Sequence, residues 1–145
     1  MSGLRWRRVF AVLPDATSVN ARIVGVRAEP PRGDGGPQPY VVTASGVVDL
    51  ASVGDLQKNL YSLVRAGRVR LIVDLSRVRL CDAAAMSVLT QVSRHCAERG
   101  GWLRLAHPVG LVAKVFDIVS LGRDVEIYPT VPAAHTGAVD DRIMR

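Results

Sequence analysis

Cysteine is scarce in this sequence, and its cysteines fit no disulfide or metal pattern. Cys81 and Cys96 are the only two among 145 residues, and they form neither a C-x-x-C metal motif nor a disulfide framework of a secreted domain. They bracket a predicted helix of about four turns, too long for the two thiols to bridge within one chain. We therefore expect two packed thiols in a reduced, cytoplasmic protein, with no metal and no other cofactor.

Long hydrophobic runs are also missing. No uncharged apolar stretch approaches the roughly 20 residues that span a bilayer. The run Val9–Leu13, which follows Arg7 and Arg8, is too short for a membrane anchor or a secretory signal. We expect no membrane insertion.

Aromatic residues and lysines are few, which argues against a nucleic-acid-binding module. Aromatics make up 5% of the chain and only two residues are lysine, while the net charge of +6 is spread along the sequence. Proteins that bind nucleic acid gather basic residues on one face, and those that read single strands interleave aromatics among them. We predict no nucleic-acid partner.

Familiar catalytic motifs are absent as well. The sequence has no G-x-S-x-G, no Walker phosphate loop and no H-E-x-x-H. His95 and Cys96 are neighbours on a predicted helix and point about 100° apart, so they cannot converge as base and nucleophile. Asp74 ends a predicted strand, as the acceptor of a phospho-receiver domain would, but no acidic pair follows the first strand to hold Mg²⁺. We predict that the protein is not an enzyme.

What the sequence does contain is an alternation of strand and helix patterns over a length suited to one domain. The predicted fold class is α/β, with a mixed sheet of four to five strands packed with three to four amphipathic helices. Leu71–Leu75, apolar apart from Asp74, is the expected central strand. The expected strands are one within 21–28, one over Tyr40–Ala44 that stops at Gly46 and resumes over 47–49, and the strands Leu71–Leu75, Trp102–Ala106 and Val125–Tyr128. The expected helices run from a Ser52-x-x-Asp55 capping box to Gly67, from Asp82 to Gly100 and from Pro108 to Gly122, with a short helix within Ala133–Met144.

The two ends of the chain differ from this regular part. Residues 1–20 are predicted to be a basic N-terminal extension, and 135–145 a tail or short helix. The domain itself is expected over 21–134. It includes a segment rich in proline and glycine at 30–38, for which we predict a flexible loop.

Four short segments in the regular part resemble the STAS domain family, the anti-sigma factor antagonists. These segments are Gly46–Asp49, Val73–Ser76, Leu80–Leu89 and Val115–Gly122. The resemblance covers about residues 21–134 and rests on the order and spacing of the segments. It implies a STAS-like fold and a small bacterial regulator of transcription. Such a protein binds an anti-sigma factor, usually a kinase-like protein, and thereby frees a sigma factor.

The resemblance also implies a phosphorylation switch that this sequence lacks. In the family a strand leads into Asp-Ser-(Ser/Thr)-Gly, and the anti-sigma partner phosphorylates the first serine at the start of the following helix. Asp82 matches the aspartate, Ala83 falls on the phospho-acceptor, Ala84 on the next hydroxyl residue and Ala85 on the glycine. Alanine has no oxygen to phosphorylate. The partner-binding surface implied by the resemblance comprises Asp49, Asp82, Ala83, Ala84, Ala85 and Met86.

Two residues near this segment have alternative interpretations. Ser87, about one turn into the predicted helix, is either a substitute phospho-acceptor or an ordinary helix serine. Asp49 matches the acidic residue that closes the family's Gly-x-x-Asp, near the same surface, or it is a turn carboxylate before Ser52. Asp82 has a local role in either case, because an N-cap aspartate stabilises a helix by about 1 kcal/mol.

Five arginines fall around the expected central strand: Arg65, Arg68, Arg70, Arg77 and Arg79. They form either one basic edge that faces an acidic partner or a solvated face.

The function predicted from the sequence is a protein-interaction module of the anti-sigma factor antagonist type, not controlled by the usual serine phosphorylation. The alternative is a STAS subunit of a transporter or ligand-sensing complex. Whether the chain forms a homodimer is left open.

Overall fold

The structure is a computed structural model, and it describes residues 25–29 and 38–143. The predicted N-terminal extension 1–20 and the predicted flexible loop lie outside the described residues, except Gln38, which ends that loop segment. The described elements are β1 Gly25–Glu29, β2 Tyr40–Val48, α2 Val53–Arg65, β3 Arg70–Cys81, α3 Ala83–Glu98, β4 Trp102–Ala106, α4 Gly110–Ile118, the 3₁₀ turn Leu121–Arg123, β5 Glu126–Tyr128, α5 Val131–Thr136 and the 3₁₀ turn Val139–Asp141.

The strands form one mixed sheet of five in the order β1-β2-β3-β4-β5. β1 is antiparallel to β2, and every other neighbouring pair is parallel. The predicted α/β class is confirmed, and β3 is the central strand as expected. In a parallel arrangement the chain returns through a helix after each strand, so α2, α3 and α4 each begin near the carboxyl edge of the sheet.

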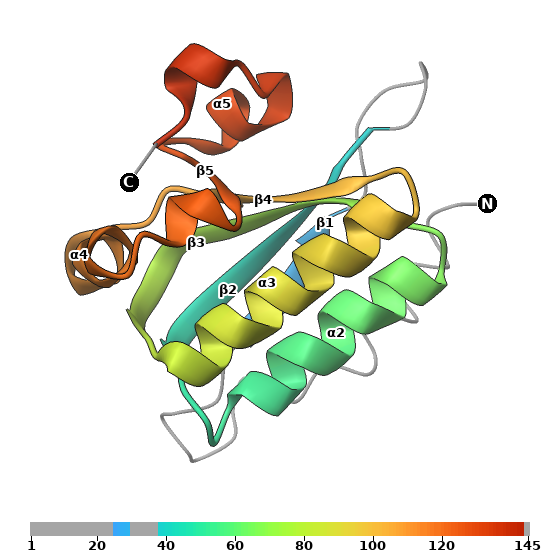
Figure 1. Ribbon diagram of the computed structural model, residues 1–145. Helices are drawn as coiled ribbons and strands as arrows, with labels where there is room; N and C mark the ends of the chain where they lie inside the picture. The colour runs from blue at the N-terminus through green and yellow to red at the C-terminus, as the bar shows by residue number, and fades with distance from the viewer. Residues whose placement is uncertain (1–24, 30–37, 144–145) are drawn as a thin grey trace.

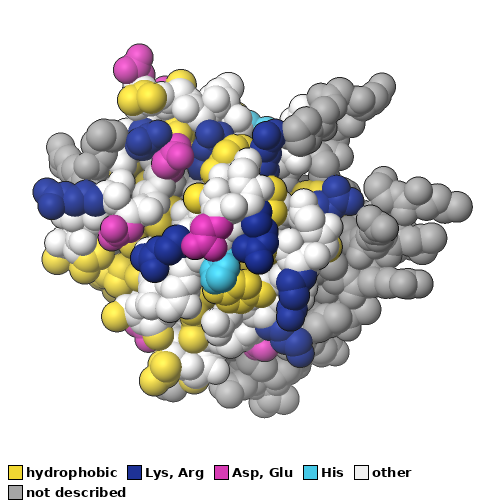
Figure 2. All heavy atoms as spheres, turned by 45° about the vertical axis from the view of Figure 1, so that its right-hand side comes forward, with side chains coloured by type: hydrophobic (Ala, Val, Ile, Leu, Met, Phe, Trp, Pro, Cys, Tyr) yellow, Lys and Arg dark blue, Asp and Glu magenta, His cyan; other side chains and the backbone are white. Residues whose placement is uncertain are grey.

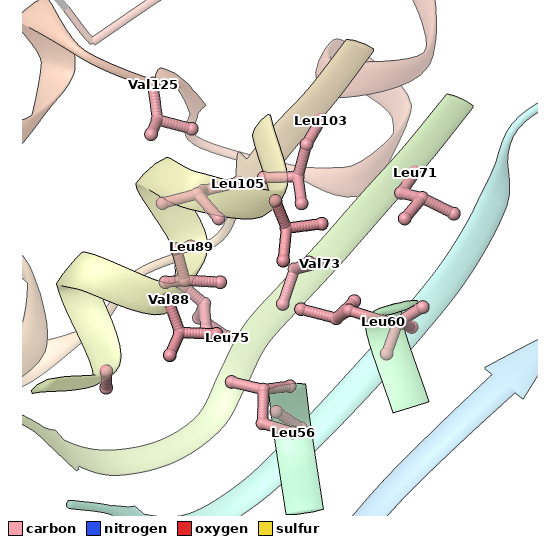
Figure 3. Packing of buried hydrophobic residues seen from close by; sticks show 14 of the residues in the cluster. Leu56, Leu60, Leu71, Val73, Leu75, Val88, Leu89, Leu103, Leu105 and Val125 are labelled. Atoms are coloured by element: carbon pink, nitrogen blue, oxygen red, sulfur yellow. The ribbon is translucent and has the colours of Figure 1, made fainter. Parts of the chain in front are cut away.

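The main core lies between the sheet and the helices α2 and α3, which run side by side across one face (Figure 1). Alternate residues of β3, Leu71, Val73 and Leu75, point into this core and are fully buried. Figure 3 shows them among leucines and valines from α2, α3 and β4. α2 and α3 are amphipathic as predicted, and each buries the one side on which its apolar residues recur at helical spacing.

The other face of the sheet carries a smaller core beneath α5, formed by Ile72, Ala106, Tyr128 and Ala134. The C-terminal segment is held there through Glu126, whose carboxylate accepts hydrogen bonds from the Tyr128 hydroxyl at 2.7 Å and from Arg142 at 2.9 Å. The two cores together bury β3 from Leu71 to Val73, whereas Arg77, Arg79 and Leu80 near the end of the strand are exposed. None of the helices in the described ranges is long and apolar enough to cross a membrane.

Two strand predictions were too short. β2 does not stop at Gly46: it runs through to Val48, with a shift in its pairing to β3 around Gly46, whose φ is +91°. β3 continues to Cys81 instead of ending at Leu75. Asp74 is therefore inside β3, where its carboxylate accepts a hydrogen bond from the Ser76 N–H at 3.0 Å.

The helix ends also differ from expectation at three places. Ser52 is the residue before α2, but its hydroxyl makes no capping bond, so the predicted capping box is wrong. α4 begins at Gly110 and ends at Ile118, so it is shorter than the helix predicted from Pro108 to Gly122, and Val119, which follows it, is 50% exposed. The last helix, α5, lies earlier than expected because Thr130 caps it by accepting a hydrogen bond from the Ala133 N–H.

Candidate functional site

Asp82 caps α3 as the sequence predicts. Its backbone is extended, and its Oδ1 accepts a hydrogen bond from the Ala85 N–H at 3.0 Å. The first N–H groups of a helix have no partner within the helix, so a carboxylate at this position satisfies one of them and interacts favourably with the helix dipole. The link from β3 to α3 is thus a single residue, Asp82, held at both its backbone and its side chain.

The second oxygen of Asp82 ties two turns together. Its Oδ2 accepts a hydrogen bond from the N–H of Leu50, 32 residues earlier, at 3.0 Å. The Asp82 N–H in turn donates to the Val48 carbonyl at 3.1 Å. The turn between β2 and α2 is therefore fixed against the start of α3, and the two form one continuous edge.

Asp49 shapes the first of these turns. Its Oδ1 accepts hydrogen bonds from the N–H groups of Ala51 and Ser52 at 3.0 and 3.1 Å. The Ser52 hydroxyl accepts from the Asp49 N–H at 3.0 Å and donates to the Val47 carbonyl at 2.8 Å. Asp49 is therefore a turn carboxylate. The turn that it shapes is the one that Asp82 holds, so Asp49 also lies close to the segment that the resemblance implies as the partner-binding surface.

The side chains around Asp82 differ in how far they reach the surface. Ala83 is exposed, whereas Ala84 and Met86 are half-buried and pack against the main core. Ala85 is fully buried. It was predicted as a partner-binding residue, but its side chain points into the core and only its N–H, bound to Asp82, belongs to the site.

The structure adds Leu50, which sequence reasoning missed. Leu50 is 79% exposed, although its N–H is fixed by Asp82. The one local signal was an apolar residue directly after Asp49 that fits no helical stripe. Leu80, at 36% exposure, lies near the end of β3, where it is paired with Val47 of β2. We call Asp49, Leu50, Leu80, Asp82, Ala83 and Met86 the Asp82 surface.

Ser87, the predicted alternative acceptor, is exposed on α3. Its hydroxyl is 3.4 Å from the side-chain nitrogen of Gln91, one turn further along the helix. Among the described contacts, none joins Ser87 to the β2–α2 turn.

The buried thiols lie apart from any reactive arrangement. Burial, with a smaller contribution from the neighbouring Asp82 charge, raises the pKa of Cys81 to about 12. Burial also raises the pKa of Cys96 to about 11, against a small opposing effect of Arg99. Both are free thiols, as predicted, and among residues 25–29 and 38–143 no three His, Cys, Asp or Glu side chains gather as metal ligands would.

The five arginines do not form one basic edge. Arg70 and Arg79 lie at opposite ends of β3, and at about 3.3 Å per residue they are separated by roughly 30 Å. Arg77 and Arg79 are exposed residues of the strand itself, near the Asp82 end, whereas Arg65 ends α2. Arg77 and Arg79 fell outside the predicted strand because its end was placed at Leu75, six residues too early.

The described residues thus form a small α/β domain whose parallel strands carry an exposed surface at their carboxyl edge. A family model described as "Mlab, STAS domain" matches residues 34–129, more than half of the chain. The chain belongs to the STAS domain family, and the resemblance seen in the sequence is confirmed.

Solved structures share this fold at low sequence identity. An anti-sigma factor antagonist from Mycobacterium paratuberculosis is 19% identical, with a TM-score of 0.70, over 81% of this chain and 96% of that one. The anti-sigma factor antagonist SpoIIAA of Bacillus, in its unphosphorylated form, is 18% identical, with a TM-score of 0.60, over 79% and 99%.

The same fold occurs within a transporter. The murine anion transporter Solute Carrier 26 family member A9 matches at 17% identity with a TM-score of 0.56, over 92% of this chain and 23% of the transporter. At these identities the similarities show the fold alone. No curated protein matches the chain.

Proposed function

We propose that the protein is a regulatory interaction module that binds an anti-sigma factor through the Asp82 surface and thereby releases a sigma factor. The observation that carries this proposal is the bond from the Leu50 N–H to Asp82, which holds an exposed leucine on a fixed turn. The similarity of the fold to two bacterial anti-sigma factor antagonists supports it. The proposal assigns the protein no catalytic step and implies a cytoplasmic location in a bacterium.

Leu50 is the expected anchor of the contact. Burying a leucine side chain contributes roughly 1.5–3 kcal/mol, and a few such residues carry most of the binding energy of an interface. A turn that is already fixed loses little conformational entropy on binding. Asp49, which precedes Leu50, and Asp82, which accepts its N–H, add negative charge that favours a partner with a basic rim.

The proposed module has no phosphate switch at the usual position. A helix N-terminus tolerates a phosphate, because its free N–H groups and dipole favour negative charge, while the added charge of about −1.5 to −2 disrupts a docked interface. Ala83 occupies the exposed position where the family implies the acceptor serine, and it offers no hydroxyl. A kinase-like partner would therefore bind this protein without being able to release itself by modifying residue 83.

The test is capture of the partner with a surface variant as control. The tagged full chain and its Leu50→Asp variant are used as baits, and the proteins that only the wild type retains are identified by mass spectrometry. The proposal predicts an anti-sigma factor, which then competes with its sigma factor for purified wild-type protein. Equal retention of that partner by Leu50→Asp would remove Leu50 from the interface.

A second candidate function is a STAS subunit of a transporter or ligand-sensing complex. A hollow of about 360 Å³ lies beside α4 and is lined by Phe116, Ile127 and Ile143 among others, a size that suits a small ligand. The transporter that shares the fold supports the same candidate. Recovery of an ATPase together with a permease in the same capture experiment would favour this function over the first.

A further inference from the structure

A group of cations covers the outward sides of α2 and α3, away from the Asp82 surface. Lys58 and Arg65 from α2, and Arg94 and Arg99 from α3 and its end, are all exposed. We call these four residues the α2–α3 basic surface. Figure 2 shows Lys and Arg side chains gathered around a histidine on the face turned to the viewer.

An aromatic contact brings the cations of the two helices together. The rings of Tyr61 and His95 meet edge to face, with their centroids 5.2 Å apart, and so join α2 to α3. Lys58 and Arg65 lie three residues before and four after Tyr61, and residues at these spacings share one side of a helix. Arg99 stands four residues after His95 and donates a hydrogen bond to its carbonyl at 3.3 Å.

Few acids balance this surface. α2 and α3 contain one acidic residue each, Asp55 and Glu98. Glu98 lies 3.9 Å from the His95 ring nitrogen, although it also stands four residues after Arg94. Within the described part of the chain, Lys58 and Arg94 form no ion pair, and their charges are left for an external group.

Helix stabilisation accounts for part of the arrangement only. Arg65 and Arg99 stand at the carboxyl ends of their helices, where a cation interacts favourably with the helix dipole, and this effect falls off within the last turn. Lys58 lies about two turns before the end of α2, and Arg94 lies a full turn before the end of α3. The dipole does not explain these two positions.

We propose that the α2–α3 basic surface binds an acidic segment of a protein partner. Charge complementarity favours such a segment. None of the exposed large hydrophobic residues among the described ones lies on α2 or α3, so the surface lacks the apolar side chains that would enter a membrane. Its aromatic ring, Tyr61, is half-buried against His95 and does not stand free to stack on a base.

This surface is separate from the Asp82 surface, and the proposal does not rest on the proposed function. Arg94 lies 12 residues beyond Asp82 along α3, which is about 18 Å along the helix axis. A partner could occupy either surface alone, or one large partner could contact both.

The test is a titration of the full chain with a fluorescein-labelled peptide of alternating glutamate and serine, followed by fluorescence anisotropy. We expect binding at low salt that weakens at about 0.15 M salt, where the Debye length is about 8 Å. Neutralising three of the cations together, in Lys58→Gln, Arg65→Gln and Arg94→Gln, should weaken binding about tenfold at low salt. Circular dichroism confirms that the variant remains folded.

The matched control removes three exposed cations elsewhere: Arg77→Gln, Arg79→Gln and Arg123→Gln. This control variant has the same net charge as the first triple variant. We expect its affinity for the peptide to stay within about twofold of that of the wild type. Equal weakening in the two triple variants would overturn the proposal, because only net charge would then matter. Tighter binding to phosphatidylglycerol vesicles or to oligothymidylate than to the peptide would also overturn it.

Discussion

Removing the carboxylate of Asp82 should both destabilise the domain and free the β2–α2 turn. Asp82→Ala deletes the acceptor of the Ala85 N–H and of the Leu50 N–H. Loss of an N-cap costs about 1 kcal/mol, and loss of a hydrogen bond to a charged acceptor costs about 1.5 kcal/mol. The sum, about 2.5 kcal/mol, corresponds to a fall of roughly 5–10 °C in melting temperature for a domain of this size.

The Asp82→Asn variant separates the two contributions. An amide has one acceptor oxygen, so it keeps one of the two hydrogen bonds whichever way it is turned, and about half of the stability loss is expected. Urea unfolding followed by circular dichroism measures each change, and Ser87→Ala, an exposed change on the same helix, is the control. An Asp82→Ala protein within about 0.5 kcal/mol of the wild type, the range of an ordinary surface substitution, would refute the reasoning.

The core and the thiols give two further predictions. Val73→Asp places an unpaired charge at a fully buried position of β3, which costs several kcal/mol and should leave the domain unfolded at room temperature; a melting temperature within a few degrees of the wild type would contradict the assignment of the core. Because the pKa of Cys81 is raised to about 12 and that of Cys96 to about 11, the unfolded thiols ionise first. Stability should therefore fall as the pH rises from about 9 to about 11. In urea unfolding at several pH values, the fall should be smaller in a protein with Cys81→Ala and Cys96→Ala.

Sequence patterns predicted the parts of the fold that rest on one-sided burial. α2 and α3 each have a single apolar stripe, and the structure buries those residues. The sequence misjudged β3 because polar residues such as Asp74 and Ser76 interrupt its apolar run. They lie on the side of the strand opposite Leu71 and Val73, so the strand continues past them.

The site was predicted only as far as its contacts are local. The cap from Asp82 to Ala85 spans three residues and can be recognised from sequence. The bond to Leu50 joins residues 32 positions apart, and only the parallel pairing of β2 with β3 brings them together. The buried position of Ala85 follows from the direction in which α3 leaves the sheet, which the four-residue motif does not specify.

Phosphate analysis after incubation with the captured anti-sigma factor and ATP tests the central claim most directly. Wild-type protein should stay unmodified and bound, since Ala83 offers no hydroxyl at the start of α3. Ala83→Ser should gain one phosphate and lose the partner, and Ala83→Glu should bind more weakly without any ATP. Stoichiometric phosphate on the wild type at Ser87, or unchanged affinity of the Ala83→Glu variant, would contradict the account.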